Sequence, residues 1–439
     1  MWRAEAEGLR MRLGGAPDAV PRPGEGLVGE FRLREGESHD VVLELSAGPV
    51  SEPLDADALW RATEQEWRRV VPDCSRLVAP RDARHAYAVL RGLTSVSGGM
   101  VAAATTSLPE RANTGRNYDY RFAWLRDQCY AGLAVAAHGP HPLADDAVRF
   151  VAERILEDGD GVRPAYTVDG RPVGGDRSLR LPGYPGGSDH VGNDAGAQFQ
   201  LDTFGEALQL FAAAAAHDRL TKDAERAAAV AVDVVERRWL RPDAGLWELE
   251  DRWWTHSRLS VVCGLRRMAQ VLPGGAGRRC DALADTVLRE TRRRCLRPDG
   301  RWRRAADDDG AEAALLVPMA RGCAFGDDGG AATRAHIESR LGEDGYLYRF
   351  EHPGEPLGDA EGAFLLCGFT MALATHRHGD RVGAFRWFER TRAACGPPGL
   401  FAEEYDVRQR QLRGNLPQAF VHATMLEAAV RLAGASTLP

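Results

Sequence analysis

The chain has 439 residues, of which 27% are charged and 44% hydrophobic, and its formal net charge is −7. This length can bury a large core and hold two or three domains, and the composition is that of an ordinary globular protein. An acidic balance of this size gives no general attraction to nucleic acid or to anionic membranes, so neither is an expected partner.

The cysteines and the apolar segments indicate the cellular compartment in which the protein is expected. The eight cysteines are dispersed, without a C-x-x-C pair or a clustered His/Cys spacing, which favours free thiols in a reducing compartment. The first residues lack the apolar run of a secretory signal, and the longest apolar stretches, such as residues 211–216, are too short to cross a bilayer. We therefore expect a cytoplasmic protein.

Residues 1–50 are predicted to form β-strands. Residues 9–13 alternate apolar side chains with arginine, residues 41–45 form a second short apolar run, and turns rich in Gly and Pro separate them. Three or four strands are too few for an independent sandwich, so we interpret residues 1–50 as a partial β-sandwich remnant. The unpaired edge of such a sheet leaves room for a homo-oligomer.

Residues 51–78 are predicted to contain a linker helix. Leu54, Trp60 and Trp67 recur at helical spacing in a charged background, and Pro72 stops the run.

Residues 79–439 are predicted to be almost entirely helical. Twelve segments show helical periodicity, and their connections alternate between brief turns and long loops rich in Gly, Trp, Tyr and charge. Long loops after every second helix indicate a toroid of six helical hairpins with the long loops at one end, where chemistry usually resides. The predicted helices are 81–96, 124–138, 142–158, 193–216, 219–238, 256–271, 277–295, 310–321, 329–341, 362–377, 381–395 and 417–433. The predicted long loops are 97–123, 159–192, 239–255, 296–309, 342–361 and 396–416.

A polar and aromatic segment, residues 116–127, is the strongest candidate for a binding site. Arg126 beside Asp127 joins a rigid fork of donors to an acceptor-only carboxylate, a pair that suits vicinal hydroxyl groups. Tyr120 and Trp124 lie four residues apart, so on a helix they would share one face and form an aromatic wall against the apolar side of a sugar ring. The alternative is an amphipathic core helix with a structural ion pair.

Two acids on separate long loops are candidates for proton transfer. Glu248 follows Trp247, whose ring would desolvate the carboxyl, raise its pKa and keep it protonated as a general acid requires. Glu403, beside Glu404, stays ionised if water and hydroxyl donors solvate it. One protonated and one ionised carboxyl across a sugar-sized gap is the minimum machinery for hydrolysing a glycosidic bond. The same pattern also fits solvated acids with no chemical role.

Seven separated motifs form a recognisable series. They are residues 105–110, 116–127, 192–193 with 200–202, 245–248 with 255–257, 348–350, 361–367, and 402–406 with 414–420. In this order they resemble glycoside hydrolase family 15, the glucoamylase and trehalase family. The resemblance implies an (α/α)6 barrel, an inverting mechanism and a pocket that accepts one non-reducing α-glucosyl unit.

The resemblance also implies roles for single residues. Glu248 falls at the position of the general acid and Glu403 at that of the general base. Apart from the resemblance, the Gly-rich segment 182–192 makes His190 and Asn193 weaker candidates for closing the pocket. The expected substrate-binding residues are Tyr120, Trp124, Arg126, Asp127, Trp247, Arg349 and Glu404, with Glu404 secondary.

The combined expectation is an inverting glycoside hydrolase that releases glucose from α-glucosides, either trehalose or the ends of α-linked gluco-oligosaccharides. Its partner is a small carbohydrate, and the scheme needs no metal and no cofactor. Two rivals stay open: a catalytically divergent or silent (α/α)6 protein in carbohydrate binding or biosynthesis, and a lyase or cyclase on the same barrel. The chain departs from the family in its shortened β-sandwich and in Tyr118, where Trp is commoner.

Overall fold

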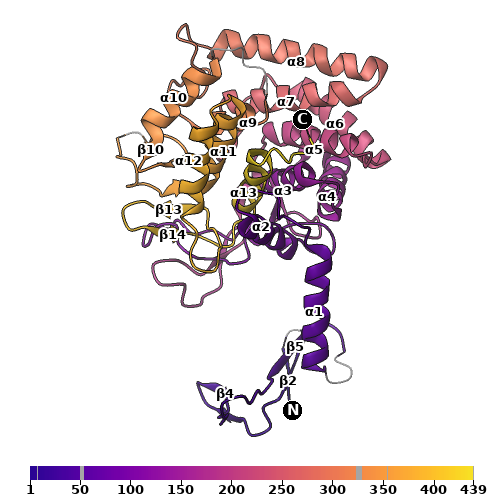
Figure 1. Cartoon of the computed structure of the whole chain (residues 1–439), viewed down its shortest axis with the longest axis vertical. Coiled ribbons are helices and arrows are strands. Elements are labelled where there is room, and N and C mark those ends of the chain that lie inside the picture. Colours follow the sequence, from indigo (N-terminus) through magenta and orange to yellow (C-terminus); the bar gives the residue numbers. More distant parts are fainter. Residues whose placement is uncertain (7, 50–53, 323–328, 353, 439) are drawn as a thin grey trace. The chain divides into compact units, whose positions relative to one another are not determined.

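The chain divides by its internal contacts into two units, Met1–Pro72 and Asp73–Pro439. The computed structural model describes residues 1–6, 8–49, 54–322, 329–352 and 354–438 (Figure 1). The expected boundary between residues 50 and 51 therefore lies outside the described residues.

The first unit contains a small sheet, a hairpin and one helix. β1 (Trp2–Ala6), β2 (Leu9–Gly14) and β5 (Val42–Ser46) form an antiparallel sheet in the order β1-β2-β5, and β3 (Val20–Arg22) pairs with β4 (Gly26–Val28). Arg12 on the central strand is 2% exposed because its Nε donates to Glu44 on β5 at 2.6 Å. Helix α1 (Ala56–Val70) begins where the Asp55 side chain accepts from the backbone of Ala58. The predicted strands and linker helix are thus present.

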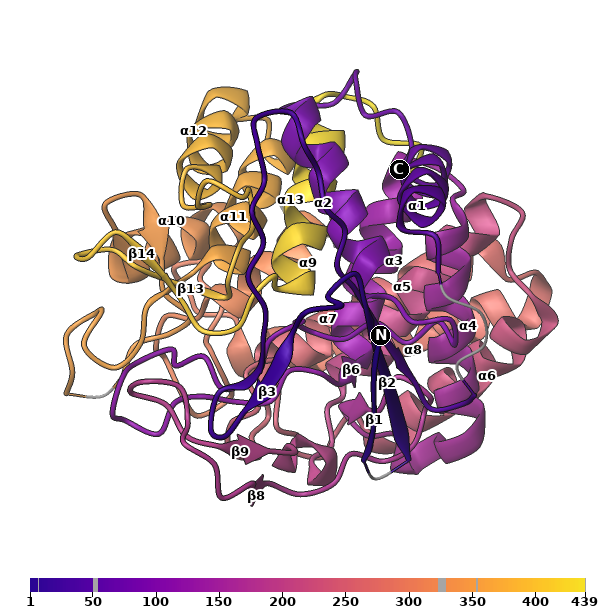
Figure 2. The same cartoon turned by 90° about the horizontal axis from the view of Figure 1, so that it is seen from below.

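The second unit is a double ring of helices (Figure 2). Helices α3, α5, α7, α9, α11 and α13 form the inner ring, in which each helix contacts the next and α13 closes on α3. The outer helices pack against them, as α4 does on α3 and α8 on α7. This is the predicted (α/α)6 barrel. Its helices are α2 (Pro80–Leu93), α3 (Leu125–His138), α4 (Pro142–Asp158), α5 (Asp202–Ala216), α6 (Lys222–Arg238), α7 (Thr255–Val271), α8 (Gly274–Cys295), α9 (Leu316–Ala320), α10 (Gly329–Leu341), α11 (Leu365–Arg377), α12 (Arg381–Arg392) and α13 (Ala419–Leu432).

Inner and outer helices differ in how much of their surface is buried. α3 is buried on every side from Leu125 to Ala137, and the residues from Cys129 onward form an apolar run that suits this position. The inner helices α5 and α7 approach each other closely, because a Cβ on Gly205 would lie 2.5 Å from the backbone of Ser260. Only glycine fits there, so the two helices can pack with their backbones in contact.

The connections alternate in length. Each long connection leads from an outer helix to the next inner helix, as from α4 to α5 and from α6 to α7. These loops hold η1 (Gly159–Gly161), η2 (Asp194–Ala197), η3 (Ala313–Leu315) and the short strands β6 (Ala123–Trp124), β7 (Ala165–Tyr166), β8 (Arg177–Ser178), β9 (His190–Val191), β10 (Gly342–Glu343), β11 (Tyr346–Leu347), β12 (Ala363–Phe364), β13 (Glu404–Asp406) and β14 (Gln411–Arg413).

Two predicted helices begin at least six residues later than expected. The segment from residue 193 forms η2, which the Asn193 side chain caps by accepting from Ala195, and α5 starts only at Asp202. The segment 310–321 contracts to η3 and α9, because Glu312 pairs with Phe350 and Ala313 donates to the carbonyl of Arg349 at 2.8 Å. Pairing with a distant loop thus replaces helix in the latter segment.

The cysteines depart in part from expectation. Six of them are free thiols, but Cys263 is disulfide-bonded, so the prediction of free thiols is wrong there. A disulfide depends on the separation of two residues in space, which sequence spacing did not reveal. Cys323 lies outside the described residues. Among the described residues, no helix combines the length and apolarity needed to cross a bilayer, and no group of His, Cys, Asp or Glu is arranged to hold a metal ion.

Candidate active site

The long loops enclose an inner pocket and an outer cavity. The same five residues line both: Tyr120, Trp247, Glu248, Arg349 and Glu403. The two candidate acids therefore lie where the pocket and the cavity adjoin. The inner pocket is completed by Ala102, Trp124, Arg126, Asp127, Leu246, Gln418 and Phe420. The outer cavity is completed by Glu110, Arg116, Asn117, Tyr118, Asp119, Asp176, His190, Gly192, Asn193, Asp194, Ala195, Gln198 and Leu249.

The loop that carries Glu248 is anchored by buried charge. Asp243, at the start of the loop, pairs with Arg258 on α7, and both side chains are fully buried. Arg126 on α3 donates from Nη1 to the carbonyl oxygen of Leu246 at 2.9 Å. The backbone just before Glu248 is thus tied to two inner helices, which hold the loop against the barrel end.

Glu248 has a constrained backbone, and its carboxyl group lies near one indole N–H and one guanidinium group. Its φ of +58° lies in the left-handed region, which costs a residue with a side chain on the order of 1–3 kcal/mol. Nε1 of Trp124 donates to Oε1 of Glu248 at 2.7 Å, and Nη2 of Arg126 lies 3.5 Å from the same oxygen. The side chain is 25% exposed, so the carboxyl is oriented by the protein and still open to the cavity.

Glu403 is the more enclosed of the two acids. It precedes β13, and its carbonyl accepts from the backbone of Leu365 at 3.1 Å. The Tyr120 hydroxyl donates to Oε2 of Glu403 at 2.8 Å. Burial raises the pKa of Glu403 to about 7, with Arg349 opposing the rise and Glu404 adding to it. The burial of the two acids is the reverse of that expected from the sequence, because Tyr120 and its own loop cover Glu403 whereas Glu248 faces the outer cavity.

Arg126 and Asp127 bring hydrogen-bonding groups to the inner pocket from the first turn of α3. Asp127 is 2% exposed, and its Oδ2 lies 3.6 Å from Nε of Arg126. Among the described atoms, neither of these two has a hydrogen-bond partner. Burial raises the pKa of Asp127 to about 6, although the neighbouring Arg126 opposes the rise. Buried polar atoms normally find partners, so this pair is suited to the hydroxyl groups of a ligand.

Tyr120 and Trp124 contact each other, but not as residues on one helical face. Their rings meet edge to face with centroids 5.6 Å apart. Trp124 belongs to β6, which pairs with β7, and α3 begins only at the next residue, Leu125. The prediction of a shared helical face is therefore wrong, since a strand pairing extends the chain here. The two rings nevertheless line the inner pocket together.

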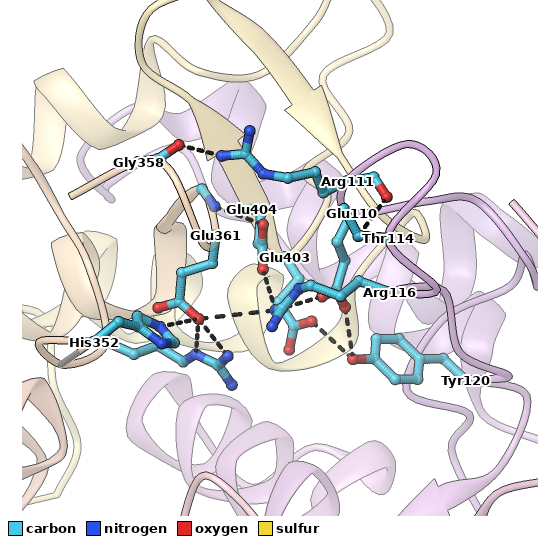
Figure 3. Close-up of polar contacts among 12 residues, drawn as sticks. Glu110, Arg111, Thr114, Arg116, Tyr120, His352, Gly358, Glu361, Glu403 and Glu404 are labelled. Atoms are coloured by element: carbon cyan, nitrogen blue, oxygen red, sulfur yellow. Dashed lines mark hydrogen bonds and ion pairs between the residues drawn. The ribbon is translucent and has the colours of Figure 1, made fainter. Parts of the chain in front are cut away.

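A cluster of charged residues lies beside Glu403 (Figure 3). Nη2 of Arg116 lies 2.8 Å from Glu110, 3.1 Å from Glu404 and 3.8 Å from Glu361. Nε of Arg349 donates to Glu361 at 3.0 Å. Although burial opposes it, Arg349 and the imidazole of His352, whose Nε2 lies 3.3 Å from Oε2, lower the pKa of Glu361 to about 2. We call this group the carboxylate cluster; it consists of Glu110, Glu361, Glu403, Glu404, Arg116, Arg349 and His352.

Glu404 lies behind the cavity rather than in its lining. It is fully buried, and its Oε2 accepts from the backbone of Gly362 at 2.8 Å while Oε1 faces Arg116. Burial raises the pKa of Glu404, and the nearby charges of Glu110 and Glu361 add to the rise. Glu404 thus contacts other protein groups and does not face the cavity.

Sequence reasoning had not assigned Glu110, Arg116 or Glu361 to the site. Their segments were among the motifs, but Arg116 and Glu404 are 288 positions apart in the chain, and only the folded barrel joins them. The signal available was their type, because charged residues are rarely buried unless they are paired. Of the weaker candidates, His190 and Asn193 line the outer cavity.

Comparison with known proteins assigns the chain to a family. The profile described as Glycosyl hydrolases family 15 matches residues 84–430. The chain belongs to this family. A solved glycosidase superposes on it with a TM-score of 0.65 at 18% identity, covering 88% of this chain and 100% of the other, which shows a common fold.

Two curated relatives of the chain are named trehalases. Over 430 residues the chain is 30% identical to the trehalase of Mycobacterium tuberculosis, covering 91% of this chain and 62% of that protein. Over 370 residues it is 30% identical to trehalase 1 of Sulfolobus acidocaldarius, covering 81% of this chain and 64% of the relative. The family 15 chain thus spans less than two thirds of the length of either relative.

Proposed function

We propose that the chain is an inverting glycoside hydrolase that cleaves trehalose to two molecules of glucose. The observation that carries the proposal is the position of Glu248 and Glu403, which come from separate loops and line both the inner pocket and the outer cavity. Each carboxyl also has its own donor, Trp124 for Glu248 and Tyr120 for Glu403. Family membership supports the reaction class, and the names of the relatives support trehalose.

The inner pocket would hold the glucosyl unit whose bond is cleaved. Arg126 and Asp127 would bind its hydroxyl groups, and the rings of Tyr120 and Trp124 would cover the apolar side of the sugar. A sugar with one inverted centre would leave a buried polar group unpaired, at a cost of about 1–3 kcal/mol. Arg349 lines the same pocket, while its ion pair with Glu361 holds the guanidinium in place.

Glu248 and Glu403 would then divide the proton transfers. Glu248 donates its proton to the glycosidic oxygen as the bond from that oxygen to the anomeric carbon breaks, and Trp124 stabilises the carboxylate that forms. Glu403 takes a proton from a water that attacks the anomeric carbon on the opposite face, while Tyr120 steadies the base. Inversion needs room for that water, so we expect the carboxyls to stand ~6.5–9.5 Å apart in the complex.

The outer cavity would hold the departing glucose, and Glu404 would act through Arg116 rather than on the sugar. The ends of α-linked gluco-oligosaccharides are the second candidate substrate. They would place the remaining chain in the same cavity, whose lining is largely polar, with Asp119, Asn193 and Gln198 among its residues.

Product analysis tests the proposal directly. The protein is incubated with trehalose, maltose, isomaltose and maltooligosaccharides, and the anomers of released glucose are followed by proton NMR before they equilibrate. Inverting cleavage of trehalose gives equal amounts of β-glucose and α-glucose, because only one of the two anomeric centres is attacked. Release of α-glucose alone contradicts inversion. Cleavage of maltose but not trehalose favours the second candidate, and no cleavage of any substrate refutes the proposed activity.

A further inference from the structure

The Tyr120 hydroxyl lies between two carboxyl groups (Figure 3). Its oxygen is 2.8 Å from Oε2 of Glu403 and 3.3 Å from Oε1 of Glu110. A phenol has a single hydrogen, so it can donate to only one of these carboxyls at a time. The second contact is a hydrogen bond only if that carboxyl is protonated and donates to the phenol oxygen.

We propose that Glu110 is a positioning residue for the general base, and that it carries a proton which it donates to the Tyr120 oxygen. The Tyr120 hydrogen is then directed to Glu403, whose carboxylate is left ionised and fixed in orientation. The order of donors is Glu110, Tyr120, Glu403. The inference rests on the proposed function, because it needs Glu403 to act as the base.

The contacts of Glu110 favour this arrangement. It is 5% exposed and lies in the wall of the outer cavity. Oε2 accepts from Nη2 of Arg116 at 2.8 Å, so Oε1 is the oxygen left to face Tyr120. The two oxygens therefore have different partners, a cation on one side and a phenol oxygen on the other, which suits a protonated carboxyl with its hydroxyl toward Tyr120.

The charges of the carboxylate cluster point the same way. Four carboxyls face two guanidinium groups there, and Arg349 is already paired with Glu361. Arg116 is shared among Glu110, Glu404 and Glu361. If every carboxyl were ionised, the buried cluster would hold more negative than positive charge, which is costly away from water. A proton on Glu110 reduces that excess without removing the charge that the base needs.

The titration of the two acids agrees with the geometry. Burial and the charge of Glu403 raise the pKa of Glu110 to about 7, although Arg116 and Arg349 oppose the rise. Burial likewise raises the pKa of Glu403 to about 7. Two acids that share one hydroxyl and titrate in one range release their protons as a pair. The other ionisable groups facing this pair are Arg116, Tyr118, Arg349, Glu404 and Asp127.

Infrared difference spectroscopy locates the proton without relying on turnover. At neutral pH we expect a carbonyl band of a protonated carboxylic acid in the parent protein that is missing in Glu110→Gln. Glu361→Gln is the matched control: Glu361 belongs to the same cluster, but its low pKa means that its replacement should remove no such band. Equal acid bands in the parent and in Glu110→Gln would overturn the proposal.

A second variant tests the link to the phenol and covers a failure of Glu110→Gln to fold. Tyr120→Phe removes the acceptor from Glu110, so the acid band should persist but move to higher frequency as its hydrogen bond is lost. An unmoved band would show that the proton on Glu110 is not bound to Tyr120, and would also overturn the proposal.

A comparison of kcat between two Glu110 variants distinguishes this positioning role from a merely structural one. The amide of Glu110→Gln can donate to the Tyr120 oxygen as a protonated acid would, whereas Glu110→Ala cannot. We therefore expect kcat to fall by on the order of tenfold in Glu110→Ala, the loss of one hydrogen bond, and by less in Glu110→Gln, with KM little changed in both. A kcat for Glu110→Gln at or below that of Glu110→Ala contradicts the inference. If the parent cleaves no α-glucoside, the proposed function fails, but the infrared comparison still locates the proton.

Discussion

Replacing Trp124 with phenylalanine isolates one hydrogen bond of the candidate active site. Nε1 of Trp124 donates to Oε1 of Glu248 at 2.7 Å, and phenylalanine keeps an aromatic ring at the position that meets Tyr120 edge to face. While Glu248 is protonated this bond is neutral, and once the proton has moved to the glycosidic oxygen it becomes a bond to a carboxylate. The bond therefore strengthens as the reaction proceeds.

The size of the effect follows from that change. A hydrogen bond between neutral groups contributes about 0.5–1.5 kcal/mol, and one to a charged group about 1.5–3 kcal/mol. The difference of ~1–2 kcal/mol applies only after proton transfer, so kcat for Trp124→Phe should fall by about 5–30-fold. The assay is initial-rate glucose release from trehalose over a range of concentrations, combined with thermal unfolding to establish that the variant is folded.

Trp247→Phe is the matched control for this change. Trp247 lines the same pocket, but among the described atoms its Nε1 has no hydrogen-bond partner, so the substitution removes no bond to Glu248. We expect a smaller decrease in kcat than for Trp124→Phe. A kcat for Trp124→Phe equal to that of the parent, in a folded protein, refutes the argument. A rise in KM alone would show that Trp124 serves binding instead.

Three further perturbations test other parts of the structure. Glu248→Gln and Glu403→Gln each remove a proton carrier, so kcat on trehalose should fall by about 10²–10⁴-fold with an unchanged circular dichroism spectrum, and near-parental turnover in either variant contradicts the assignment. Burial raises the pKa of Glu312 from 4.5 to about 8, so the folded state keeps a proton that the unfolded state loses, and stability should fall as pH rises through this interval. Glu312→Gln cannot ionise, so the melting temperature of the variant minus that of the parent should be larger near pH 8 than near pH 4.5. The same difference in melting temperature at both pH values excludes the linkage. Gly205→Ala places its Cβ 2.5 Å from the backbone of α7 and should lower the free energy of unfolding by about 1–3 kcal/mol. Gly275→Ala on α8, with nothing nearer than 4.0 Å, should be neutral or stabilising in the same denaturation experiment, and equal effects would exclude the close-packing explanation.

The barrel was predictable because its signal is local. Inner helices such as α3 contain long apolar runs and outer helices such as α8 are amphipathic, so periodicity identified each helix of the second unit before the structure was known. The segment 310–321 was mistaken for a full helix because its backbone pairs with residues near Phe350. Such pairing depends on a contact between distant segments, which periodicity does not record.

The sequence predicted which residues line the site better than it predicted how deeply each of them is buried. Arg126 and Asp127, named from the sequence, lie around the same inner pocket as Glu248 and Glu403. The relative burial of the two acids was predicted the wrong way round, because a neighbour in sequence such as Trp247 says little about which residues from other loops cover a carboxyl. Glu110 escaped notice because its burial is visible only in the folded loop, where it contacts Arg116 and Tyr120.

The closing contact between α13 and α3 has a consequence for the making of the protein. The loop just before α13 carries Glu403, so the base and the last inner helix are both synthesised after the other five inner helices. A growing chain on the ribosome has every other inner helix but neither a closed ring nor a complete pair of acids, and its apolar inner helices await their final neighbour. Appearance of the enzyme's activity would therefore report completed synthesis of the barrel, and a fragment that stops before α13 would expose the interior that this helix covers.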